Sequence, residues 1–219
     1  MLAAMKMATM TNKMSKKETR KLLTIEPAGP ADIAGLVELL NIKHPTAWIK
    51  RISHAGLQKF LRYSINNLRS VILMARMDDD RSAGYIFSTF DTKRFWLGFS
   101  SRYPVTMSRI ISYRLRGLYN AYKRRNHEQG NLSHLPGFSW SPSGPGTARI
   151  MGTLVRKEHR GKGVATELYK RLFDALREKK CYKIEEYMGP DYCDFVGKYQ
   201  DCGWDFQQLN KGYKMVKYL

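Results

Sequence analysis

A short loop of glycine and basic residues separates a strand-like segment from a strongly amphipathic helix. Residues 155–168 read VRKEHRGKGVATEL, so that a strand ends at Val155 and a helix begins near Val164. The first turn of a helix presents unpaired backbone N–H groups and the positive end of the helix dipole. Glycines allow a phosphate to approach that backbone closely because they have no Cβ. The segment therefore predicts a strand–loop–helix unit whose loop holds a pyrophosphate.

Two other phosphate-binding loops do not fit this segment. Lys162 is not followed by the Ser or Thr that GxxxxGK[ST] requires, and the glycine spacing is not GxGxxG. Taken alone, RGKG is equally compatible with a glycine-rich connection that binds no ligand. The flanking sequence has to decide between these readings.

The hydrophobic pattern of the whole chain predicts alternating strands and helices in one domain. We expect an α/β fold of the α+β mixed-sheet type over residues 22–219, preceded by a disordered basic tail over 1–21. Residues 93–146 form a predicted insertion of helix and loop, in which an amphipathic helix over 104–125 buries Ile111 and carries a basic side. The predicted strands are 22–28, 71–77, 83–90, 148–155, 182–188, 204–208 and 213–218, and the other predicted helices begin at Pro30 or span 57–65, 164–179 and 194–202.

Two motifs together resemble the GNAT (Gcn5-related) acetyltransferases. The stretch 160–165, RGKGVA, matches the family's Arg/Gln-x-x-Gly-x-Gly/Ala signature, with Glu158-His159 ahead of it and Leu168 one turn into the helix. Downstream, 199–204 (YQDCGW) resembles the family's closing Tyr-x-x-x-Gly-Phe element, and the spacing between the two motifs agrees. The resemblance implies the GNAT acyl-CoA N-acyltransferase fold, with a helical insertion before the catalytic strand.

The resemblance also implies an enzyme, an N-acetyltransferase that uses acetyl-CoA, and it assigns roles to several residues. Leu154 and Val155 would pair with the pantetheine arm, which enters where the parallel strands ending at Val155 and Met188 separate. Backbone N–H groups near Val155 would stabilise the oxyanion, and Tyr199 would donate a proton to the leaving thiolate. The backbone amides that would hold the CoA pyrophosphate belong to Arg160, Gly161, Lys162, Gly163, Val164 and Ala165. The chain departs from the family pattern at Tyr192, where Asn is common, and at Lys157, where Pro is common.

The general base that must deprotonate the acceptor amine is not assigned by the sequence. The strand 148–155 contains no carboxylate. Glu185 and Glu186 lie on the next strand, where alternation directs one of them to each face of the sheet. Glu158 in the loop and His134 in the insertion are the other candidates, and a water chain is a further alternative.

The formal charge of +19 indicates anionic partners. The insertion has nine basic and no acidic residues between Lys93 and Arg125, and its layout resembles GNAT members that acetylate amino sugars for bacterial surface polysaccharides. The predicted acceptor is therefore a small, anionic, nucleotide-linked amino sugar whose diphosphate would be met from the insertion by Arg109, Arg114, Arg116 or Lys123.

Three alternatives to this acceptor remain open. The enzyme could acetylate a protein or peptide amine instead. A nucleic-acid-binding module with Tyr113, Tyr119 and Tyr122 stacked on bases is less favoured, because their helical spacing is also what core packing produces. The basic helix could also make a peripheral contact with an anionic membrane.

Cysteine and histidine usage gives no metal site or disulfide framework. The three cysteines are an odd number without CxxC spacing, and the five histidines show no ligand spacing. No apolar run approaches the length of about 18 residues that spans a bilayer. We expect a cytoplasmic protein by default, with an organellar transit segment at the N-terminus as the second choice.

Overall fold

The computed structural model describes residues 23–43, 53–77, 82–112, 143–188, 199–209 and 212–219. They form one seven-stranded mixed sheet in the order β1-β2-β3-β4-β5-β7-β6, which confirms the predicted fold class. The strands are β1 Leu23–Pro27, β2 Ser70–Met77, β3 Ser82–Phe90, β4 Thr147–Val155, β5 Lys183–Met188, β6 Asp205–Leu209 and β7 Gly212–Tyr218. The helices are η1 Pro30–Asp32, α2 Ile33–Lys43, α3 His54–Ile65, α4 Thr92–Arg102, η3 Lys157–His159 and α6 Val164–Glu178.

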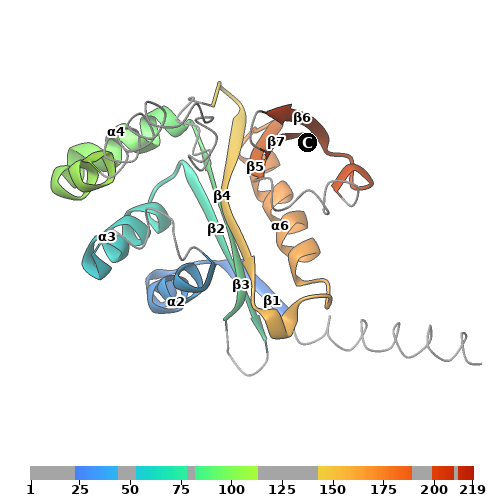
Figure 1. Cartoon of the computed structure of the whole chain (residues 1–219), viewed down its shortest axis with the longest axis horizontal. Coiled ribbons are helices and arrows are strands. Elements are labelled where there is room, and N and C mark those ends of the chain that lie inside the picture. Colours follow the sequence, from blue (N-terminus) through green and yellow to red (C-terminus); the bar gives the residue numbers. More distant parts are fainter. Residues whose placement is uncertain (1–22, 44–52, 78–81, 113–142, 189–198, 210–211) are drawn as a thin grey trace, which may run out of the picture.

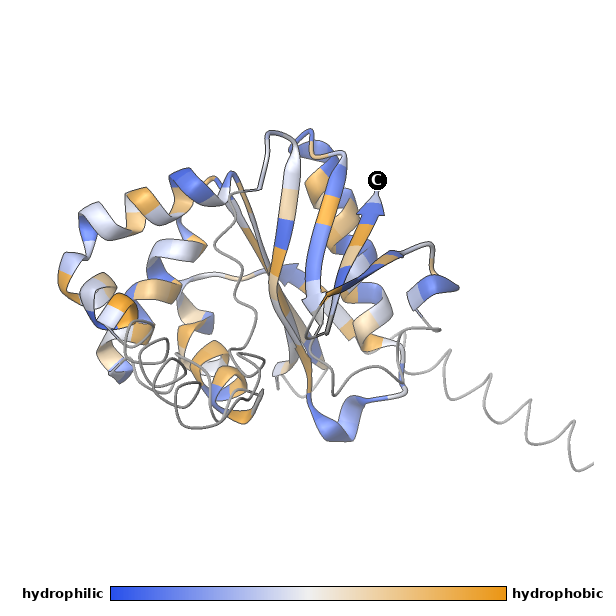
Figure 2. Cartoon of the chain, turned by 45° about the horizontal axis from the view of Figure 1, so that its top comes forward, coloured by the Kyte–Doolittle hydropathy of each residue, from blue (hydrophilic) through white to orange (hydrophobic). Residues whose placement is uncertain are grey.

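Helices cover both faces of the sheet. Helices α2, α3 and α4 lie on one side, which we call the α2 face, and α6 lies on the other, the α6 face (Figure 1). Hydrophobic residues form stripes along these helices, with hydrophilic residues between them (Figure 2). Each face has its own core: Leu36, Phe60 and Phe95 pack on the α2 face, whereas Leu168 and Leu172 pack on the α6 face.

The sheet is antiparallel except where β4 pairs with β5. Helix α6 makes the crossover that a parallel pair requires. The parallel pairing is short: Thr147–Arg149 pair with Lys183–Glu185, and the ladder ends there. The remainder of β4, up to Val155, has no partner on β5 among the residues that the structure describes.

A β-bulge interrupts β4 just beyond the last parallel pair. Phe87 of β3 pairs with Gly152 and Ser88 pairs with Ile150, which leaves Met151 as the extra residue. A bulge changes the direction of the side chains that follow it. Thr153 accordingly contacts Tyr169 on α6, although strict alternation would place it on the same face as Arg149.

The predicted insertion is partly described. It begins with α4, a helix that the sequence analysis did not identify, and continues with a helical segment over 104–112. The prediction that Ile111 faces the core is wrong: Ile111 is 42% exposed, whereas Met107 and Ile110 are buried against the α2-face core. The side of this segment that packs on the α2-face core therefore carries Met107 and Ile110 rather than Ile111.

Several predictions fall on residues outside the described ranges. The tail 1–21, the helix beyond 112, the loop up to 142 and most of the helix 194–202 belong here. Within the described parts of the chain, no helix is both long and apolar enough to cross a membrane.

Candidate active site

The loop between β4 and α6 has the open, left-handed glycine geometry that a phosphate site needs. Gly161 and Gly163 have φ of 77° and 83°, and a Cβ placed on either would meet no atom within 4 Å. Gly163 directly precedes α6, whose first turn receives no side-chain cap. The loop from Arg160 to Gly163 is exposed, so its backbone is accessible to an anion. These features fit the pyrophosphate predicted from the sequence.

Three contacts fix the position of this loop. The Arg156 guanidinium donates to the Ser82 carbonyl at 2.7 Å and to Glu38 at 2.7 Å, which ties the end of β4 to β3 and α2. Arg160 Nε donates to the carbonyl of Val155 at 3.2 Å. The loop therefore begins from an anchored strand end rather than from a free one.

The early end of the β4–β5 ladder leaves a gap between two parallel strands. Leu154 and Val155 follow the last residue of β4 that pairs with β5, and they pair with β3 on the opposite edge of the strand. The Leu154 side chain is buried on the α2 face, and Val155 packs toward α6. Among the described residues no strand pairs with this edge of β4, and this is the edge where the resemblance places the pantetheine arm.

Tyr199 belongs to a group of side chains that we call the tyrosine cluster: Thr153, Tyr169, Glu186 and Tyr199. The Tyr169 hydroxyl donates to Glu186 Oε2 at 2.7 Å and accepts from Thr153 Oγ1 at 3.4 Å. The rings of Tyr199 and Tyr169 pack edge to face, with their centroids 6.2 Å apart. The cluster joins β4, β5 and α6 to the segment that carries Tyr199.

The environment of the tyrosine cluster keeps its phenols protonated. Burial, and then the negative charge of Glu186, raise the pKa of Tyr199 above its ordinary value of 10.0. The same two causes raise the pKa of Tyr169 further still. Tyr199 therefore carries its phenolic proton at neutral pH.

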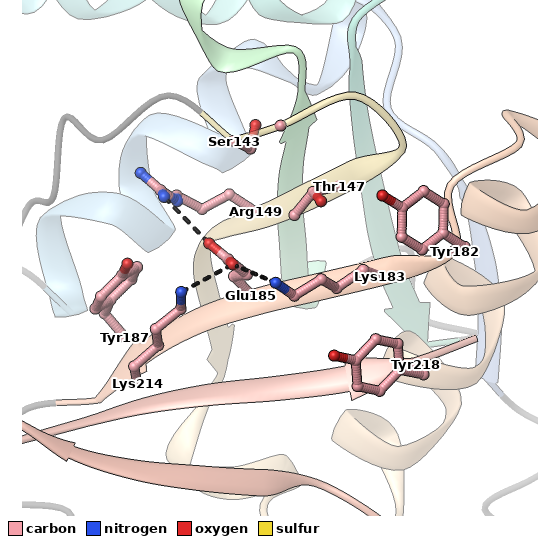
Figure 3. A pocket seen from close by; sticks show the side chains of 10 residues that line it. Ser143, Thr147, Arg149, Tyr182, Lys183, Glu185, Tyr187, Lys214 and Tyr218 are labelled. Carbon is pink, nitrogen blue, oxygen red and sulfur yellow. Dashed lines mark hydrogen bonds and ion pairs between the residues drawn. The ribbon is translucent and has the colours of Figure 1, made fainter.

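A cavity of about 520 Å³ opens on the α2 face, at the closed end of the β4–β5 ladder. Figure 3 shows Arg149, Lys183 and Lys214 converging there on the carboxylate of Glu185. The Arg149 and Glu185 side chains are 7% and 8% exposed, and their closest N–O distance is 3.3 Å. We call these four residues the charged cluster. Its cavity is also lined by Ser143, Gly144, Thr147, Tyr182, Tyr187 and Tyr218.

Glu185 and Glu186 point to opposite faces, as the alternation predicted. Burial raises the pKa of Glu185, but hydrogen bonds and charge from Lys214 and Lys183 outweigh it and hold that pKa below its ordinary 4.5. Such a carboxylate is a weak base, whereas Glu186 belongs to the tyrosine cluster. Glu158 lies exposed in η3, and His134 is outside the described residues. The general base therefore stays unassigned.

Sequence reasoning did not identify Arg149, Tyr169 or Lys214. An arginine between Ala148 and Ile150, in a strand expected to be buried, was a usable signal for Arg149. Tyr169 and Lys214 carry no such signal, because their contacts depend on tertiary packing. Among the described residues, no group of His, Cys, Asp and Glu side chains could hold a metal ion.

Comparison with known proteins agrees with this geometry. The model of the acetyltransferase (GNAT) family matches residues 36–192, and no curated protein sequence matches the chain. The PaiA N-acetyltransferase of Thermoplasma acidophilum, solved with coenzyme A, is 12% identical, with a TM-score of 0.56 over 90% of this chain and 99% of that one.

Two further similar structures act on different amines. A ribosomal-protein alanine N-acetyltransferase from Escherichia coli is 9% identical, with a TM-score of 0.52 over 90% of this chain and 94% of that one. An aminoglycoside antibiotic 6'-N-acetyltransferase from Acinetobacter baumannii is 14% identical, with a TM-score of 0.52 over 85% and 93%. At these identities the likeness concerns the fold, and the acceptor has to be argued from this chain's own residues.

Proposed function

Since the chain belongs to the GNAT family of acetyltransferases and is an acetyl-CoA-dependent N-acetyltransferase, we propose that its acceptor is a small anionic amine, a nucleotide-linked amino sugar of surface-polysaccharide synthesis. The observation that carries the enzyme role is the gap that opens beyond Arg149 and Glu185, next to an exposed glycine loop at the helix start. The gap would accommodate the extended pantetheine arm, and the glycine loop would accommodate the pyrophosphate.

Acetyl-CoA supplies a thioester carbonyl that an uncharged amine attacks. In the proposed arrangement, backbone N–H groups from Arg160 to Ala165 hold the pyrophosphate, and the dipole of α6 adds to their attraction. The β4 backbone at Leu154 and Val155 binds the arm as an additional strand. N–H groups of β4 near Val155, on the edge that has no β5 partner among the described residues, would then stabilise negative charge on the carbonyl oxygen.

Tyr199 is the proposed proton donor to the departing thiolate. Its phenol stays protonated because burial and Glu186 raise its pKa. Edge-to-face contacts with Tyr169, which is hydrogen-bonded to Glu186, and with Trp204 hold the Tyr199 ring in place. A phenol held in this way can donate its proton directly, so that the thiolate does not need a proton from solvent.

The anionic acceptor is supported by charge and by the position of the insertion. The chain carries a formal charge of +19. Ser143 and Gly144, at the end of the insertion, line the cavity on the α2 face, and Ser143 is hydrogen-bonded to Thr92 at the insertion's start. The predicted insertion thus forms one wall of a cavity next to the gap, where an acceptor would lie.

Turnover tests this function. The full chain with acetyl-CoA is assayed for CoA release on a panel of UDP-linked amino sugars, free amino sugars and peptides with free amines. We expect the UDP-linked sugars to give the highest kcat/KM. Activity on peptides, with none across the nucleotide-linked sugars, would refute the acceptor and leave the acetyltransferase intact.

A further inference from the structure

The charged cluster on the α2 face contains more positive than negative charge. Arg149, Lys183 and Lys214 each contact the single carboxylate of Glu185, so these four described residues together carry a formal charge of +2 beside the cavity. A cluster that served only to neutralise a buried acid would need one cation. A net positive charge in a partly desolvated site raises the free energy of the folded protein, and a bound anion would lower that free energy.

The two lysines have the geometry to bind a ligand. Their ammonium groups lie 3.0 Å and 2.9 Å from the same oxygen, Glu185 Oε1, and their side chains are about one quarter exposed. An ammonium has three N–H donors, and the contact with Glu185 uses one of each. The Glu185 carboxylate therefore holds both lysines at the cavity, as Figure 3 shows. Two N–H donors on each ammonium are left for a ligand in the cavity.

We propose that this cavity binds the diphosphate of the acceptor, with Lys183 and Lys214 as the direct ligands and Arg149 and Glu185 positioning them. A diphosphate diester carries two negative charges, which match the excess of the cluster. The inference rests on the proposed function. It replaces the phosphate ligands predicted from the sequence, Arg109, Arg114, Arg116 or Lys123, of which only Arg109 lies in the described residues.

The cavity lies close enough to the gap for one small molecule to place its phosphates in the cavity and its amine at the gap. The charged cluster includes Arg149 and Glu185, the last pair of the β4–β5 ladder. The bulge at Met151 is two residues further along β4, which corresponds to about 7 Å of strand. An acceptor held by its phosphates in the cavity would thus present its amine toward the gap. Tyr182 and Tyr218 at the rim offer aromatic faces to the remainder of the molecule.

Calorimetric titration of the full chain with inorganic pyrophosphate tests the inference. CoA is kept saturating, so that the glycine loop is already occupied. We expect wild type to bind pyrophosphate, and the double variant Lys183→Gln/Lys214→Gln to bind it at least about tenfold more weakly, a loss of about 1.4 kcal/mol. Lys59→Gln/Lys170→Gln, which removes two charges from the exposed sides of α3 and α6, is the matched control and should bind like wild type; Lys59→Gln alone, which removes one, should do so too.

Each outcome is decisive because CoA affinity is measured on the same samples. Unchanged CoA affinity in the double variant shows that it is folded. If CoA binds but pyrophosphate binds equally well to wild type and the double variant, or not at all, the cavity is not a phosphate site. Loss of pyrophosphate binding in Lys59→Gln/Lys170→Gln as well would mean that only the overall charge matters, and this too overturns the inference. Absence of CoA binding to wild type would instead refute the proposed function.

The single variant Glu185→Gln provides a test of opposite sign. It removes the one negative charge of the cluster but keeps an amide oxygen that can accept from the lysines and hold them in place, so pyrophosphate should bind more tightly than to wild type. A cluster with a purely structural role would show no tightening, and unchanged or weaker binding in a variant that retains CoA affinity contradicts the inference.

Discussion

Placing a negative charge at Gly163 should abolish most of the affinity for CoA without disturbing the fold. Gly163 has φ of 83°, and a Cβ there meets nothing within 4 Å, so a new side chain is not excluded by packing. A non-glycine residue in this conformation costs about 1–2 kcal/mol of stability, and less for Asp or Asn. That strain is present with and without ligand, so it lowers the free energy of unfolding and not the affinity.

The loss of affinity comes from charge. In Gly163→Asp the carboxylate would lie about 5 Å from a bound pyrophosphate, where Coulomb repulsion is about 0.8 kcal/mol in bulk water and about 3 kcal/mol at an effective dielectric constant of about 20. Because the loop is exposed, we take an intermediate value of about 2 kcal/mol, which is roughly thirtyfold in Kd. The carboxylate would also compete for the N–H groups at the start of α6.

The matched control is Gly163→Asn, which has the same size and backbone strain without the charge. We expect calorimetry with acetyl-CoA to show near wild-type affinity for Gly163→Asn and a roughly thirtyfold higher Kd for Gly163→Asp, with the difference shrinking as salt is raised. Equal affinities for the two variants would refute the assignment of this loop to the pyrophosphate, whatever their stability.

Three further perturbations follow from the contacts described above. Tyr199→Phe should lower kcat by about a hundredfold with little change in the KM for acetyl-CoA, and wild type should show no alkaline loss of activity below about pH 10, because the pKa of Tyr199 is raised; steady-state pH profiles measure both. Glu185→Gln should cost about 3 kcal/mol in denaturant unfolding, since it breaks a buried ion pair. The folded-state pKa of Glu185 is lowered, so wild type loses this contribution as pH falls below 4.5, and the variant should be less sensitive there. Gly84→Ala should destabilise by about 1–3 kcal/mol and weaken acetyl-CoA binding, because its Cβ would lie 3.2 Å from Val155 Cα and closer still to the Leu154 carbonyl oxygen.

The local parts of the fold could be predicted because their signals are local. The apolar stripe of α6 is visible in the sequence, and Val164, Leu168, Leu172 and Leu176 are indeed buried. The hairpin of β2 and β3 and the final pair of strands were predicted for the same reason. Glycine and helix signals placed the loop between Val155 and α6 within a residue or two.

The active-site surroundings depend on pairings that the sequence does not show. Alternation predicts that Glu185 and Glu186 face opposite sides, but not which partners meet them. Lys214 reaches Glu185 only because β7 inserts between β5 and β6 in the sheet. Tyr169 lies beside the buried stripe of α6. Its hydrogen bonds to Thr153 and Glu186 join β4 to β5, and the helical pattern alone does not predict these contacts.

The bulge at Met151 explains how one strand serves both faces of the sheet. Arg149 lies on the α2 face in the charged cluster, and in a regular strand Thr153, four residues later, would lie on that face too. The extra residue shifts the alternation, so that Thr153 instead reaches Tyr169 on the α6 face. The same irregularity adjoins the end of the parallel ladder. A single inserted residue thus separates the proposed acceptor side, before the bulge, from the proposed proton-donor side, after it.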